Sequence, residues 1–147
     1  MPVAAEETVR NVFALIDNMQ SGKVPWTQFD ELTTDDFTAF VPGQQLDREQ
    51  FKAVMQTFAS AFSDSAHTIT DLVCQGDTAM VREVWHGTQT GTFLGASPTG
   101  KRVQSVVFVM IKFDDAKIKE FHEVFDTLAL MQGTGFMPKP DSAKPLT

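Results

Sequence analysis

The sequence predicts an α+β domain in which three amphipathic helices cover one face of an antiparallel sheet. As far as Phe62, apolar residues recur at intervals of three and four, and from Ala66 onward they alternate with polar residues as in strands. Two of the connections between the later strands are only two or three residues long, so consecutive strands should be antiparallel. Helices followed by a separate run of strands are typical of the α+β class.

Three helices are expected in the first part of the chain. The first covers about residues 4–20 and is followed by Gly22, and the second is short and begins at Pro25. Asp47 and Gln50 are spaced as in a capping box, which predicts the start of the third helix. Each helix has an apolar stripe. The stripes consist of Val9, Val12, Phe13, Ile16 and Met19, of Trp26, Phe29 and Leu32, and of Phe51, Val54, Met55, Phe58 and Phe62.

The second part of the chain is expected to form the sheet, after a short strand that ends at Pro42-Gly43. Gly76-Asp77 and residues 114–116 are the predicted hairpin turns, and Asp126 is placed to cap a short terminal helix at about 127–132. Residues 1–133 therefore form one domain, and the proline-containing tail 134–147 should be extended or disordered. The strands are expected at 37–41, 66–75, 78–93, 101–113 and 117–126.

Composition excludes several classes of function. The 147 residues include 12 Lys and Arg against 19 Asp and Glu, a formal net charge of −7, which argues against nucleic acid or an anionic membrane as a partner. No membrane span or secretory leader is evident, so a soluble cytoplasmic protein is expected. One cysteine, Cys74, and three histidines offer no metal-ligand spacing, so no metal or cofactor is predicted. Without tyrosine, a mechanism that needs a phenolic proton donor is also excluded.

The strand at 101–113 is apolar on both of its faces. One parity includes Val107 and Val109, and the other includes Val106 and Phe108. The helices can cover only one of these faces. The second apolar face needs another cover, which predicts a homodimer through the sheet. The alternative is a monomer that exposes some apolar side chains.

Glu123 is the first candidate for chemistry. On the last strand it alternates with Phe121 and Phe125, so if these rings face the interior the carboxyl group does too. Poor solvation of a carboxylate raises its pKa toward the range that is useful for a general acid or base. The alternative is a solvated or lysine-paired Glu123 at a strand end or pocket rim.

The other ionisable residues are weaker candidates. His67 and His86 are interpreted as structural or rim residues, and His122 is expected on the dimer side because neighbours on a strand face opposite ways. One member of the pair Arg82 and Glu83 should point inward, but the pattern leaves open which one.

Two stretches resemble the SnoaL-like polyketide cyclase family, which belongs to the nuclear transport factor 2-like superfamily. They are the stretch 87–103, GTQTGTFLGASPTGKRV, and the stretch 113–123, FDDAKIKEFHE. The match in motif order covers about residues 76–133. The resemblance implies a cone-shaped, cystatin-like α+β fold, with a curved antiparallel sheet wrapped around the N-terminal helices, an apolar cavity and dimerisation through sheets.

In the cyclases of this family an acidic residue drives an aldol ring closure without cofactor or metal, and that acid falls on Glu123. The chain departs from the family pattern at three points. Gln89 replaces a usual histidine, Phe121-His122 replaces a common His-Trp pair, and Glu123 stands where aspartate is expected. Gln89 can form hydrogen bonds but cannot carry a proton back and forth.

The resulting hypothesis is a cyclase, isomerase or lyase that acts on a small apolar or aromatic carbonyl compound. Glu123 would take a proton next to the carbonyl group, and Gln89 would orient the substrate. The alternative is a non-catalytic small-molecule binding protein of the same fold, and a third possibility is a structural or partner-binding role. The predicted substrate-binding residues are Phe13, Phe37, Phe58, Val107, Val109, Phe121 and Phe125.

Overall fold

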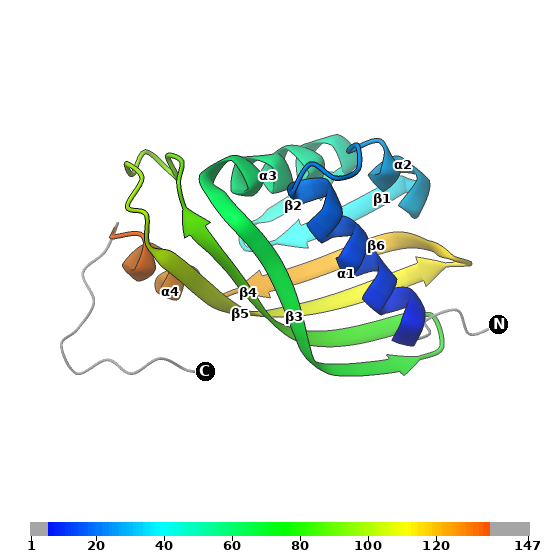
Figure 1. The fold of residues 1–147 in the computed structure, drawn as a ribbon. Helices are drawn as coiled ribbons and strands as arrows, with labels where there is room; N and C mark the ends of the chain where they lie inside the picture. Colours follow the sequence, from blue (N-terminus) through cyan, green and yellow to red (C-terminus); the bar gives the residue numbers. More distant parts are fainter. Residues whose placement is uncertain (1–5, 136–147) are drawn as a thin grey trace.

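A computed structural model of the protein describes residues 6–135, which form a curved six-stranded sheet with helices packed against it (Figure 1). The strand order is β2-β1-β6-β5-β4-β3. The helices are α1 (Glu6–Gln20), α2 (Gln28–Leu32), α3 (Arg48–Ala61) and α4 (Thr127–Gly133). The strands are β1 (Thr33–Val41), β2 (Gln44–Asp47), β3 (Phe62–Gln75), β4 (Thr78–Gln89), β5 (Arg102–Asp114) and β6 (Lys117–Phe125).

All neighbouring strands of the described sheet are antiparallel except β1 and β6, which are parallel. The last strand therefore lies between the first hairpin and the β3–β5 meander. The predicted tail falls outside the described residues apart from Thr134 and Gly135, and the hydroxyl of buried Thr134 donates to the carbonyl of Leu130. The first two residues of the predicted first helix also lie outside them.

The first three strands along the chain differ from the sequence prediction. β1 begins at Thr33 rather than at 37, because Thr33 is fully buried and pairs with Ile118 of β6. The turn at Pro42-Gly43 is followed by the unpredicted strand β2, whose side chains are largely exposed and so give little periodic signal. β3 begins at Phe62, and Asp64, with φ at 58°, lies in an irregular stretch of its pairing with β4.

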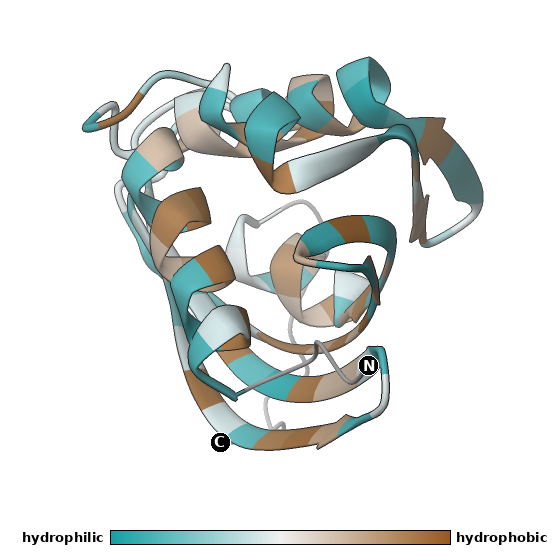
Figure 2. Cartoon of the chain, turned by 90° about the vertical axis from the view of Figure 1, so that its right-hand side faces the viewer, coloured by the Kyte–Doolittle hydropathy of each residue, from teal (hydrophilic) through white to brown (hydrophobic). Residues whose placement is uncertain are grey.

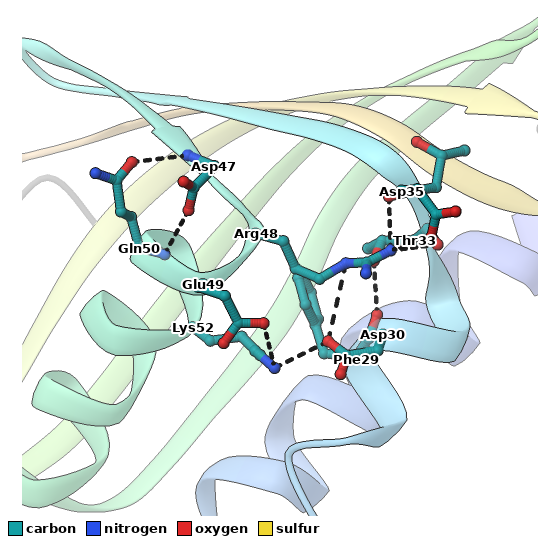
Figure 3. Close-up of polar contacts among 10 residues, drawn as sticks. Phe29, Asp30, Thr33, Asp35, Asp47, Arg48, Glu49, Gln50 and Lys52 are labelled. Atoms are coloured by element: carbon teal, nitrogen blue, oxygen red, sulfur yellow. Dashed lines mark hydrogen bonds and ion pairs between the residues drawn. The ribbon is translucent and has the colours of Figure 1, made fainter.

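The start of α3 is fixed by the capping box that the sequence predicts. Asp47 accepts a hydrogen bond from the backbone of Gln50, and the Gln50 side chain accepts one from the backbone of Asp47 (Figure 3). The next residue, Arg48, donates to the backbone carbonyls of Thr33 and Thr34 at 3.0 and 2.7 Å. These bonds tie α3 to the beginning of β1. Asp126 caps α4, as predicted, by accepting from the backbone of Ala129.

Hydrophilic and hydrophobic residues are interspersed along the helices and strands (Figure 2). The buried stripe of α1 is the one predicted from its spacing, and it includes Val9, Phe13 and Ile16. No helix of residues 6–135 has the length and apolar character needed to cross a membrane.

The sheet has two faces that differ in composition. The helix face, which is covered by α1 and α3, carries Glu83 and Glu123 among apolar residues. The outer face carries Arg82 and His122. It also carries an outer apolar patch, in which the exposed fractions are 66% for Val73, 47% for Met80, 53% for Phe108 and 63% for Val124.

Candidate functional site

A cavity of about 240 Å³ lies between the helix face of the sheet and helices α1 and α3. Most of its wall is apolar, and it is interrupted by six side chains that carry a carboxyl, amide, imidazole or hydroxyl group: Gln20, Gln44, His67, Glu83, Ser105 and Glu123. The rest of the wall consists of Phe13, Ile16, Val41, Pro42, Phe51, Val54, Met55, Phe58, Trp85, Val107, Phe121, Phe125 and Leu130.

Six of the nine site residues predicted from the sequence line this cavity. They are Glu123, Phe13, Phe58, Val107, Phe121 and Phe125. The other three lie elsewhere. Phe37 packs in the core against Phe29 and Phe51, with ring centroids 5.3 and 5.8 Å away, and Val109 is buried between Val81 and Glu123 of the neighbouring strands.

Gln89 lies at the end of β4 and does not line the cavity. Its side-chain NH₂ donates to the carbonyl of Ser97 at 3.3 Å, and its oxygen accepts from the hydroxyl of Thr99 at 2.8 Å. The side chain is fully buried, so both ends of the amide are used to hold the loop that follows. The role of orienting a substrate, which the family motif suggests for this residue, does not fit this position.

Glu123 enters the cavity from β6. Phe121 and Phe125 flank it on the same face, as the alternation in sequence predicts, and its side chain is partly exposed to the cavity. Within the described residues its carboxylate has no hydrogen bond or ion pair. Burial raises the pKa of Glu123, and the charge of His67 opposes part of this rise.

Glu83 is the inward member of the pair that the sequence left open. It lies on β4 between Val81 and Trp85, with 1% of its surface exposed. Burial raises its pKa to about 8, the charge of His67 lowers it, and the charges of Glu123 and Asp17 add to the rise. One oxygen, Oε2, is buried without a hydrogen-bond partner. Arg82 lies on the outer face and donates to the hydroxyl of Thr70 at 2.8 Å.

His67 and Asp17 form a pair that sequence reasoning missed. His67 lies on β3 opposite Trp85 and lines the cavity, and Asp17 lies on α1. The imidazole Nδ1 and the Asp17 Oδ1 are 2.6 Å apart. On the other side of the ring, Nε2 is 3.9 Å from Glu83 Oε1. Asp17, His67 and Glu83 therefore form a chain of three ionisable groups, and His67 and Glu83 line the cavity together with Glu123.

The other two histidines do not reach the cavity. His86 lies on the outer face of β4, and burial and the charge of Arg102 lower its pKa. His122 lies on the outer face of β6, where its ring stacks on Phe40 with centroids 4.3 Å apart and its Nε2 is 2.9 Å from Glu120. Among residues 6–135 no group of three or more His, Cys, Asp or Glu side chains is arranged to hold a metal ion.

Comparison with known proteins identifies the family. The model of the SnoaL-like polyketide cyclases matches residues 12–133. The chain belongs to the SnoaL-like polyketide cyclase family. This confirms the resemblance in the two motif stretches, and no curated protein matches the chain.

Solved structures confirm the fold. A protein of Jannaschia sp. assigned as a SnoaL-like polyketide cyclase has a TM-score of 0.78 at 23% identity, over 94% of this chain and 97% of that one. IdmH of Streptomyces antibioticus, assigned as a polyketide cyclase, has a TM-score of 0.74 at 24% identity, over 88% and 96% of the chains. A Catenulispora acidiphila protein with a ketosteroid isomerase-like fold, in complex with trimethylamine, has a TM-score of 0.68 at 17% identity, over 97% and 100%.

Proposed function

We propose that this protein is a cyclase, isomerase or lyase that moves a proton at the carbon next to a carbonyl group, with Glu123 as the base. The observation that carries the proposal is the placement of Glu123. Its carboxylate faces a mostly apolar cavity and has no partner within the described residues. A base of this kind is available to a ligand, and a raised pKa makes its carboxylate a stronger base than a solvated one.

The chemistry requires only one residue to start. Glu123 takes the proton, and the electron pair of the broken C–H bond forms the C=C bond of an enolate while the carbonyl pair moves to oxygen. In a ring closure, the enolate carbon then forms a bond to a second carbonyl carbon of the same molecule. The protonated Glu123 returns its proton to the new alkoxide, so the enzyme ends as it began.

The size and lining of the cavity favour a small, largely apolar ligand. Its volume of about 240 Å³ is slightly below the roughly 300 Å³ at the lower end of sites for drug-sized ligands. Aromatic side chains from α1, α3 and the sheet line it, including Phe13, Phe58 and Trp85. An aromatic ketone or β-keto ester of one or two rings suits this size and surface.

Proton exchange tests the proposal without knowledge of the natural substrate. The protein is incubated in D₂O with 2-tetralone or an aromatic β-keto ester, and loss of the α-proton signal is followed by NMR against buffer alone. Glu123→Gln should slow the catalysed exchange by about 100-fold or more, because a positioned base contributes roughly that factor. The matched control is Glu120→Gln, which removes a carboxylate from the outer face of the same strand.

Equal exchange by wild-type protein and Glu123→Gln would reject Glu123 as the base. If wild-type protein binds the ketones without any exchange above buffer, the enzymatic proposal fails, and the alternative of a small-molecule binding protein replaces it.

A further inference from the structure

His67 is held in one orientation by Asp17. The backbone N–H of His67 lies 3.3 Å from Asp17 Oδ2, and its ring Nδ1 lies 2.6 Å from Asp17 Oδ1, so both carboxylate oxygens bind the same residue. The ring of Phe13, whose centroid is 5.7 Å away, packs beside the imidazole. This arrangement fixes the direction of the whole ring.

The opposite ring nitrogen is free to bind a ligand. A carboxylate only accepts hydrogen bonds, so Nδ1 carries a proton and donates to Asp17. Nε2 has no hydrogen bond within the described residues. Its nearest ionic neighbour, Glu83 Oε1 at 3.9 Å, is beyond hydrogen-bond distance. His67 lines the cavity, so this nitrogen is the end of the pair that a ligand can reach.

The surroundings favour a proton on Nε2. Three carboxyl groups face the imidazole: Asp17 from α1, Glu83 from β4 and Glu123 from β6. Burial lowers the pKa of His67, but the hydrogen bond to Asp17 and these three groups together raise it above its ordinary value. His86, on the outer face of β4, is also coupled to His67, and the charge of His67 lowers the pKa of His86.

We infer that His67 is a second catalytic residue, which donates from Nε2 to the carbonyl oxygen of the ligand, and that Asp17 is its positioning residue. This inference rests on the proposed function and completes it. When Glu123 removes the α-proton, negative charge develops on the carbonyl oxygen. A donor already fixed in a water-poor cavity stabilises that charge without having to reorient. The proton stays on His67, and no oxidant or other reactant is needed.

A phenolate tests this role separately from turnover. The probe is 4-nitrophenol, a one-ring compound that ionises near neutral pH and whose phenolate absorbs at longer wavelength than the phenol. Its ionised oxygen resembles the enolate oxygen. Binding is measured by absorbance at pH 7 in the Glu123→Gln variant, which has no charge at position 123, as in the state after proton transfer.

Glu123→Gln should bind nitrophenolate at least about tenfold more tightly than Glu123→Gln/His67→Gln. The matched control is Glu123→Gln/His86→Gln, which loses a histidine from the outer face and should bind like the single variant. Circular dichroism and thermal melting confirm that the variants are folded. Equal affinity of the His67 variant, or no nitrophenolate binding by Glu123→Gln, would overturn the inference.

Asp17→Asn tests the positioning role by pH dependence. Asparagine can still accept from Nδ1, but it removes the negative charge that favours the imidazolium. Binding of nitrophenolate should be lost as pH rises through the pKa of His67, and Asp17→Asn should move that loss to lower pH. An unchanged pH profile would contradict the role, because an aspartate that only supports the fold would not determine the pH at which nitrophenolate binding is lost.

The two proposals can fail independently. Nitrophenolate binding that depends on His67, together with no α-proton exchange by wild-type protein, would leave a binding site with a His67 donor and no enzyme. Exchange that depends on Glu123 but is unchanged in His67→Gln would keep the base and remove the donor.

Discussion

Each face of the sheet carries residues that depart from the usual separation of buried apolar and exposed charged side chains. On the helix face, Glu83 is buried and Glu123 faces the cavity, whereas on the outer face Phe108 and Val124 are exposed. Burial of a carboxyl group lowers the stability of the fold, and proteins keep such destabilising groups most often at functional sites. A contiguous exposed apolar patch is typical of a surface that meets a partner. The contrast therefore sets a helix face with carboxyl groups at a cavity against an outer face with exposed apolar side chains.

The largest expected difference between the faces is in packing. Phe121→Ala on the helix face should lower the free energy of unfolding by about 3 kcal/mol, since the buried ring leaves a larger void. Phe108→Ala on the outer face should lower it by less than about 1 kcal/mol, because half of that ring is already exposed. Urea denaturation at one fixed protein concentration measures both. Similar losses for the two variants would mean that the faces are not distinguished by burial.

The second difference is in the response to pH. The pKa of Glu83 is raised to about 8 in the folded protein from 4.5 in the unfolded chain. Between these two pH values the folded state therefore binds more protons than the unfolded state. Stability should therefore fall as pH rises through this range. Glu83→Gln should reduce the fall by on the order of 3 kcal/mol between pH 5 and pH 9, measured by urea denaturation. Glu120→Gln is the matched control, and an unchanged slope in Glu83→Gln would show that Glu83 is not the titrating group.

The third prediction concerns what covers the outer face. We propose that the outer apolar patch pairs with the same patch of a second copy, as a two-fold dimer through the sheet. Phe108→Glu places a charge within the patch and should weaken self-association at least about tenfold, equivalent to about 1.4 kcal/mol. Sedimentation equilibrium measures this, with Glu120→Gln as the control. A monomeric wild-type protein at micromolar concentration would contradict the dimer.

The smallest effect should come from Arg82, the sequence neighbour of Glu83. Arg82 is on the outer face and makes only partly exposed contacts to Thr70 and Asp71. Arg82→Gln should change the free energy of unfolding by less than about 0.5 kcal/mol, in contrast to the pH-dependent effect at the next position. A loss above 1 kcal/mol in urea denaturation would place Arg82 in a more demanding environment than its exposure indicates.

Much of this arrangement follows from local patterns. The alternation of Phe121, Glu123 and Phe125 predicts an inward carboxyl group, and Glu123 lines the cavity. Val81, Glu83 and Trp85 repeat the pattern on β4, which is the signal that could have identified Glu83. On β4, however, the set of alternate residues that includes Arg82 also contains an apolar residue, Val84. Periodicity alone therefore does not decide whether Arg82 or Glu83 points inward.

The rest depends on contacts between distant parts of the chain. Asp17 and His67 are 50 positions apart, and local spacing does not specify which residue of a helix meets which residue of a strand. The early start of β1 likewise depends on pairing with β6, near the other end of the described chain. Gln89 shows that a motif can identify a position without predicting the contacts of its side chain. A family motif identified the position, but Ser97 and Thr99 bind its amide.

Helix α1 contributes both an aromatic wall, through Phe13, and the anion that orients His67. Detachment of this single helix would open the cavity to water and release the imidazole at the same moment, while the ladder of strands stayed paired. Fraying at the amino-terminal side of the domain would thus dismantle the proposed ligand site well before global melting, and the His67 ring resonance in an NMR spectrum would be the earliest reporter of it.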